Sequence, residues 1–338
     1  MIVSLRWLRL FLNIGFFIFL AIAALNYKTS VYLIYQAKGQ LLLLMNTQTI
    51  AEYKKNASLT SNEKNNIKLI TEIKNYSVDS LGYTATKNFT SIYDQKDAPV
   101  LWVIAACEPY GLNAYVWNFP IVGYVTYKGF FKKQLAEKEY THLIALGYDV
   151  DLRPVSAWST LGWFHDPVLS SMLKRSKGSL CNLLFHELFH ATYYATNSVD
   201  FNENVASFIA HKGTLRFLKN DTTALKEYLL NYNDNKIFNN YMLRKIDYLK
   251  KYYEQIKDHT NKYTLKLKVI SEIADSIEKL PLGNKTKYQY RKKEILKFKN
   301  AYFVDFVQYD SMQDSLEHVF NKIYKGKIEK MVQDLRLN

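Results

Sequence analysis

The segment LLFHELFHATYY constrains the fold of this chain most, because it places His186, Glu187 and His190 inside an apolar run. On an α-helix, positions four apart lie on one face, so both imidazoles can reach a single zinc ion. Glu187 then points beside the metal, where it can act as general base toward an activated water. The alternative is a pair of core histidines satisfied by carbonyls or carboxylates. It is disfavoured because three polar side chains in an apolar helix are costly to bury.

A catalytic zinc ion needs a third protein ligand and an open position. We expect Glu203, in DFNENVASFIAHKG, because small residues on its helical stripe would let a second helix approach closely. These small residues are Ala206, Ser207 and Ala210. His211 is the rival third ligand, two turns further along. The expected cofactor is therefore Zn²⁺, bound by both motif histidines and Glu203.

The same segment predicts the ends of the second helix. We expect Asp200 or Asn202 to cap its start, and Lys212 with Gly213 to close it. In the alternative interpretation, Glu203 only completes a capping box with Asp200.

Other polar side chains are weaker candidates for the site. Tyr193, Tyr194 and His165 could each donate a hydrogen bond to the oxyanion of a tetrahedral intermediate. Asp200 could accept a hydrogen bond from a zinc-bound histidine, although a helix cap is its commoner role. The spacing selects none of these residues.

The amino-terminal segment predicts export of the rest of the chain. Arg6 and Arg9 precede an apolar stretch from Leu10 to Leu25. Residues 7–27 therefore predict an uncleaved membrane anchor, or a signal peptide cleaved near Ala21-Ile22-Ala23. We expect the remaining chain on the periplasmic or extracytoplasmic side, membrane-anchored, or secreted if the signal is cleaved.

Composition favours a helix-rich α+β fold. The 338 residues include only 12 glycines and 6 prolines, too few turn formers for a typical β-sandwich, and 48% are hydrophobic, which excludes a disordered chain. Short apolar runs predict strands at residues 98–106, 120–131 and 148–153 among helices. Two cysteines, Cys107 and Cys181, exclude a disulfide scaffold and are expected to be small buried residues.

Charge and organisation divide the chain into three parts. We expect an anchor or signal at residues 1–27, a region carrying the motif at 28–213, and a basic helical region packed on it at 214–338. The last region carries much of the net charge of +14, densest at Lys285 to Lys299. This run could bind nucleic acid or be a solvated helix face near anionic headgroups. We do not expect nucleic acid as a partner, because the chain is exported.

Several longer stretches extend the pattern beyond the motif. They are VYLIYQAKGQLLLL (31–44), VWNFPIVGYVTYKGFF (116–131), LGYDVDLRPVSAWSTLGWFHDPVLSSML (146–173), FHELFHATYY with DFNENVASFIAHKG, and a fainter one at 299–320. Through them the chain resembles the putative bacterial aminopeptidase family of HExxH zinc metallopeptidases. The resemblance implies a zincin-like core of gluzincin type, with His186, His190 and Glu203 binding zinc and Glu187 as the catalytic base.

Two features depart from that family. AWSTLGWF has Trp158 where the family has tyrosine, so any catalytic help from that tyrosine is missing here. No lipoprotein cysteine follows the apolar segment, so the anchor would be the segment itself.

We therefore expect zinc-dependent hydrolysis of a peptide substrate, held by β-pairing to a strand within residues 147–160. Exopeptidase or endopeptidase action stays open, because Glu108, Asp166 and Asp200 are only candidate partners for a free amine. The alternative is a non-catalytic membrane-tethered binding or scaffold protein that retains the metal site. The intact Glu187 disfavours it, because a structural site does not need a general base.

Overall fold

The computed structural model of the chain describes residues 13, 26–55, 58–119, 123–155, 165–196, 198–304, 306 and 312–337. Most of the expected anchor or signal segment lies outside these residues, and so does Trp158. Within the described part, none of the helices combines the length and the apolar composition that a bilayer crossing requires.

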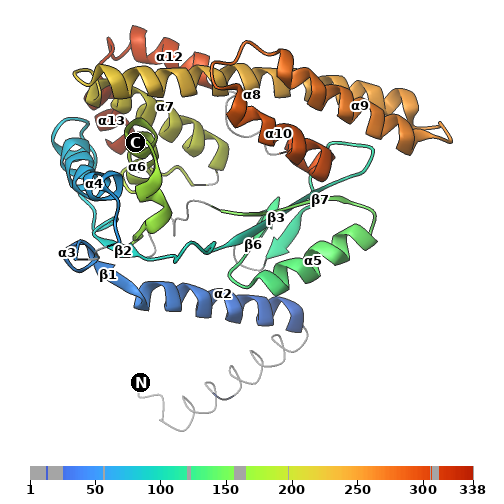
Figure 1. Cartoon of the computed structure of the whole chain (residues 1–338), viewed down its shortest axis with the longest axis horizontal. Helices are drawn as coiled ribbons and strands as arrows, with labels where there is room; N and C mark the ends of the chain where they lie inside the picture. Colours follow the sequence, from blue (N-terminus) through green and yellow to red (C-terminus); the bar gives the residue numbers. More distant parts are fainter. Residues whose placement is uncertain are drawn as a thin grey trace, which may run out of the picture.

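The described chain is a helix-rich α+β structure, which confirms the predicted class (Figure 1). The helices are α2 (Tyr27–Met45), α3 (Ile50–Tyr53), α4 (Ser61–Asp79), α5 (Lys133–Ala145), η1 (Ser170–Lys174), α6 (Lys177–His190), α7 (Val199–Phe217), α8 (Thr222–Ile256), α9 (Lys262–Ser276), η2 (Ile277–Lys279), α10 (Lys285–Phe298), α11 (Asn300–Val304), α12 (Gln313–Lys322) and α13 (Ile328–Leu337). The strands are β1 (Thr47–Thr49), β2 (Ser91–Tyr93), β3 (Trp102–Cys107), β4 (Trp117–Phe119), β5 (Gly123–Val125), β6 (Tyr127–Phe130), β7 (Asp149–Pro154) and β8 (Val168–Leu169).

The predicted apolar strands form the central sheet, in the order β6-β3-β7. Both pairings are antiparallel: Ala105 on β3 pairs with Tyr127 on β6 and with Asp151 on β7. Side chains of β3 such as Ile104 and Ala106 are fully buried, as the apolar run from residue 98 to 106 predicts. Gly147 has φ +87 between α5 and β7, a left-handed conformation that is common where a helix ends. Two smaller sheets, β1-β2-β8 and β4-β5, complete the described strands.

The buried apolar side chains of the helices form two large clusters. One surrounds α6 and includes residues of α4, α7, α12 and α13; the other joins the second half of α8 to α9, α10 and α11. Helix α8 is 35 residues long and contributes to both clusters, with Tyr228 in the first and Phe238 in the second. The expected boundary after residue 213 falls within α7. The division into regions 28–213 and 214–338 stays a prediction.

A buried polar joint fixes the carboxy-terminal helices on the sheet. Lys266 of α9 donates to Asp149 of β7 at 2.5 Å, and the backbone N–H of Asn300 donates to the same carboxylate oxygen at 3.0 Å. Tyr253 of α8 donates to the Asn300 side chain at 2.6 Å. Burial lowers the pKa of Lys266, and Asp149 opposes this shift. Removing either Lys266 or Asp149 would leave the other charge buried and unpaired, which costs about 3–5 kcal/mol. These contacts link α9 and α11 to β7.

The two cysteines are free and fully buried, which confirms the prediction of small core residues. Burial is the main reason that the pKa of each thiol is raised to about 12. Neither thiol is therefore a reactive thiolate at neutral pH.

Candidate metal centre

Helix α6 presents the motif as its apolar sequence predicts. Leu180, Leu184, Phe185 and Leu188 are fully or almost fully buried along this helix. The burial of this face fixes the rotation of the helix, and His186 and His190 then lie on its other side near the carboxyl end.

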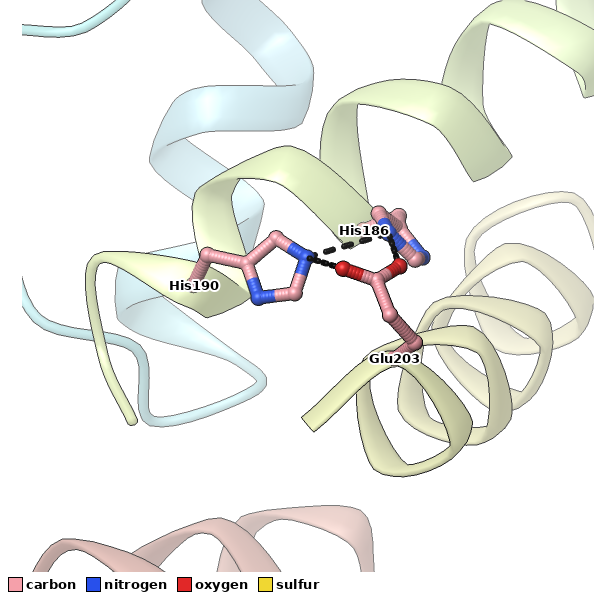
Figure 2. A group of neighbouring side chains, drawn as sticks. All are labelled: His186, His190 and Glu203. Atoms are coloured by element: carbon pink, nitrogen blue, oxygen red, sulfur yellow. Dashed lines mark hydrogen bonds and ion pairs between the residues drawn. The ribbon is translucent and has the colours of Figure 1, made fainter. Parts of the chain in front are cut away.

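Helix α7 approaches α6 closely through its small residues. Ala206 and Ala210 are fully buried, and a Cβ atom at Gly213 would lie 3.4 Å from the Phe185 ring of α6. The predicted stripe of small residues therefore has the expected effect. It brings Glu203, in the first half of α7, opposite the two histidines of α6 (Figure 2).

The predicted ends of this second helix are wrong. The helix begins at Val199 after Ser198, and no side chain caps its start by a hydrogen bond. Instead, Asn202 clamps Ala195 with two hydrogen bonds of 2.8 Å, to its backbone N–H and its carbonyl. Gly213 lies inside the helix, which continues to Phe217, because its missing Cβ is needed for contact with Leu81 rather than for a left-handed cap.

The donor atoms of His186, His190 and Glu203 converge on one point (Figure 2). The two histidine Nε2 atoms are 3.1 Å apart, and the Glu203 carboxylate oxygens lie 3.2 Å from His186 Nε2 and 3.5 Å from His190 Nε2. A tetrahedral zinc ion at about 2.0–2.2 Å from each donor separates neighbouring donors by roughly 3.3–3.5 Å. Two imidazole nitrogens and one carboxylate with this spacing therefore fit Zn²⁺ with its fourth position open.

Electrostatics favours the metal-binding forms of Glu203 and His190, whereas His186 favours its protonated form. Burial opposes ionisation of Glu203, but the hydrogen bond and positive charge of His186 outweigh it and lower the pKa of this carboxyl. Burial and the neighbouring His186 lower the pKa of His190 to about 4. The pKa of His186 is raised, because the hydrogen bond to Glu203 and the charges of Glu187 and Glu203 outweigh the effect of burial. A bound cation would therefore compete with a proton at His186.

The outer nitrogens of the two imidazoles have different surroundings. His186 Nδ1 lies 3.4 Å from Ser207 Oγ, on the same stripe of α7 as Glu203. The sequence predicts Ser207 only as a small residue and misses this contact, which orients the ring. His190 Nδ1 is buried and makes no hydrogen bond within the described residues.

Glu187 lies beside the three converging side chains and is not one of them. Burial is the main reason that its pKa is raised, and the negative charges of Glu203 and Asp166 add to the shift. A carboxylate of increased basicity next to a metal position is suited to accept a proton from water. Asp166 itself is almost fully buried, with an exposed fraction of 2%.

Tyr127 of β6 is a site candidate that the sequence analysis missed. Partial desolvation raises the pKa of its phenol, and the negative charge of Glu203 raises it further. The phenol is thus within electrostatic range of Glu203 and is 55% exposed, which makes it a candidate hydrogen-bond donor to a substrate. No motif marks this residue, which lies about 60 positions before His186 on strand β6.

The three predicted oxyanion donors are not among the converging side chains. Tyr193 packs between Phe189 and Phe201, with ring centroids 6.3 Å from each, as a partly buried side chain against the core. Tyr194 is 44% exposed and lies within electrostatic range of Tyr127. His165 is exposed next to the undescribed residues 156–164, and Asp200 is exposed in the first turn of α7.

The rival ligand His211 lies outside the converging group. It stacks on Tyr232 with ring centroids 3.7 Å apart, and its Nδ1 lies 2.9 Å from the Tyr228 hydroxyl. Burial, with the charge of Lys212, lowers the pKa of His211 to about 4. These contacts give His211 a structural place between α7 and α8.

One protein-family model matches almost the whole chain, from residue 31 to residue 336, and its description is "Putative aminopeptidase". The chain belongs to this family. The match includes α6 and α7, and therefore the histidines and the glutamate that converge between them. No curated protein and no solved structure matches the chain. Membership of an aminopeptidase family indicates a hydrolase that acts on peptides.

Proposed function

We propose that this member of the aminopeptidase family is a zinc-dependent peptidase of gluzincin type, built on a zincin-like core. The observation that carries the proposal is the triangle formed by His186, His190 and Glu203, whose donor atoms all lie within 4.8 Å of one another. Two histidines four residues apart and a glutamate from a second helix make a donor set used by catalytic zinc. When bound, Zn²⁺ supplies a Lewis acid that polarises the substrate carbonyl and lowers the pKa of water.

The protein's own side chains move the proton and stabilise the developing charge. Glu187 accepts a proton from the attacking water and delivers it to the nitrogen of the leaving amine. Tyr127 donates a hydrogen bond to the substrate carbonyl oxygen as that oxygen gains negative charge. Ser207 acts only through His186, by holding its imidazole ring.

The location and the binding mode of the substrate are also proposals. We propose that residues 7–27 tether the chain to a membrane and that the metal centre works on the extracytoplasmic side. Strand β7 lies within the range 147–160 expected to pair with substrate and is an outer strand of the β6-β3-β7 sheet. Its outer edge is therefore the proposed place for an added peptide strand.

A pair of matched peptides tests aminopeptidase action. We expect the full chain, purified in detergent and loaded with zinc, to release the first residue of a peptide with a free amino terminus. The N-acetylated form of the same peptide should be cleaved at least about 100-fold more slowly, because the enzyme loses an interaction with a charged group. Mass spectrometry of both digests identifies the bond that is cut. Internal cleavage of both forms would instead assign an endopeptidase, and no cleavage of either form in a peptide library would contradict the proposal.

Replacing Tyr127 with phenylalanine tests its role as a donor. We expect kcat to fall by about 10²-fold with little change in KM, because the hydroxyl acts mainly when the carbonyl oxygen is charged. Tyr124→Phe on strand β5 is the matched control, since Tyr124 is a more exposed tyrosine at 78%. Steady-state kinetics measures both variants. An unchanged kcat for Tyr127→Phe would assign the charge stabilisation to another residue.

A further inference from the structure

Helix α2 is fixed on the protein by one face. Tyr32 and Gln36 both donate to the carbonyl of Gly129 on strand β6, each at 2.8 Å. The side-chain oxygen of Gln36 also accepts from the backbone N–H of Phe131 at 3.3 Å. Gly39 lets the helix seat directly on the Phe131 ring, because a Cβ atom there would lie 2.2 Å from the ring carbon. These contacts determine which side of α2 faces away from the sheet.

The outward side of α2 is mainly apolar, with the exposed Lys38 on the same stripe between Ile34 and Leu41. Five large apolar side chains recur on this side at helical spacing, and each is about one half to nearly three quarters exposed. They are Tyr27 (65%), Ile34 (66%), Leu41 (58%), Leu42 (48%) and Met45 (71%). Figure 1 shows α2 along one outer side of the molecule, on the opposite side of the sheet from α8 and α9. An apolar surface of this kind on a helix marks an interaction site rather than an ordinary solvated face.

Both charged side chains of α2 are positive. Lys28 and Lys38 are exposed, and the 19 residues of α2 contain no aspartate or glutamate. A groove beside the helix has an apolar lining that includes Leu42, Val100 and Phe131, with Lys38 and Lys132 also lining it. The Lys132 ammonium lies 4.2 Å from the centre of the Tyr35 ring, on α2. Exposed apolar side chains with flanking lysines are the pattern of a helix at a membrane interface.

The sequence indicates what covers this face. The apolar stretch from Leu10 to Leu25 ends immediately before α2 begins at Tyr27, so a chain held in a bilayer by that stretch has α2 at the bilayer surface. A second copy of the chain would instead place Lys28 and Lys38 against an identical helix that offers no acidic partner. Phospholipid phosphates can pair with these lysines while the acyl region takes up the apolar side chains.

We propose that α2 lies in the interface of a bilayer that contains anionic phospholipid, with Ile34, Leu41 and Met45 directed into it. Because hydrogen bonds join α2 to β6, this contact also fixes the orientation of the central sheet relative to the membrane. This contact rests on the membrane tether proposed for residues 7–27 and does not depend on the chemistry proposed for the metal centre.

Site-specific fluorescence tests the proposal on the full chain in vesicles of phosphatidylcholine and phosphatidylglycerol. Met45→Cys takes a polarity-sensitive label, while Cys107 and Cys181 are fully buried and are not expected to react in the folded protein. Tyr290→Cys on α10 is the control, because Tyr290 is similarly exposed at 68% and lies in the basic carboxy-terminal run. We expect blue-shifted emission at Met45 and loss of about half of it or more to nitroxide-labelled lipid, with neither effect at Tyr290.

The other outcomes would overturn the proposal in distinguishable ways. Blue-shifted emission at Met45 without quenching by the lipid nitroxide would mean that protein covers α2, either the amino-terminal segment or a second copy. Red-shifted emission without quenching would leave α2 in water, and quenching only at Tyr290 would assign the lipid contact to α10. As a second variant, Ile34→Asp with Leu41→Asp should abolish quenching of the Met45 label while the far-ultraviolet circular dichroism is unchanged. Retained quenching in that variant would also contradict an apolar contact.

Discussion

We expect replacement of Glu187 with glutamine to lower kcat by about 10²–10⁴-fold and to leave zinc binding intact. The amide has nearly the same shape as the carboxylate but cannot accept the proton of the attacking water. Glu187 lies outside the group of converging donor atoms, so the metal should not depend on it. Steady-state kinetics on the peptide with a free amino terminus, together with the zinc content of each preparation, measures both parts of the expectation.

Glu72→Gln is the matched control for this variant. Glu72 is an exposed glutamate of α4, and its replacement removes the same charge from the chain away from the metal centre. Its kcat should equal that of the unmodified protein. Turnover retained by Glu187→Gln would remove Glu187 from the role of base, and loss of zinc from it would show that this side chain helps to hold the metal.

Replacing His190 with alanine removes one of the three metal donors. We expect zinc affinity to fall by more than about 100-fold, since even the loss of an outer-shell partner costs 10–100-fold. A ligand that binds only the folded state raises the melting temperature. Zinc should therefore raise Tm of the unmodified chain and have little effect on Tm of His190→Ala. Differential scanning calorimetry with and without zinc, after treatment with a chelator, measures the difference.

His259→Ala controls for the loss of a histidine. His259 is exposed in the turn between α8 and α9, so its replacement should leave the zinc-dependent rise in Tm intact. Full zinc occupancy in His190→Ala would contradict the assignment of His190 as a ligand. An equal loss of zinc in both variants would point to a general effect on folding.

The helix with the two histidines was predictable because its evidence is local. Apolar residues at helical spacing fix α6, and the four-residue interval between His186 and His190 fixes their common face. Glu203 was also predictable, since the small residues that follow it on α7 indicate a close helix contact. The nearness of its carboxylate to both imidazoles follows from that contact.

The features that the sequence did not reveal depend on contacts between distant segments. Gly213 reads as a helix terminator, yet in the structure it accommodates Leu81, which lies more than 100 residues earlier. Asn202 reads as a cap but binds the backbone of Ala195 in the preceding loop. Tyr127 lies within electrostatic range of Glu203 from strand β6, which pairs with β3, and a single sequence contains no local signal of that pairing.

The central claim is a three-ligand zinc site, and the most direct test is the metal in the full chain itself. Elemental analysis after purification without added metal should give about one zinc per chain, and X-ray absorption at the zinc edge should show nitrogen and oxygen neighbours at about 2.0–2.2 Å without sulfur. Glu203→Ala should lose most of that zinc. A chain that binds no zinc even after reconstitution, or that holds it equally well without Glu203, would contradict the account.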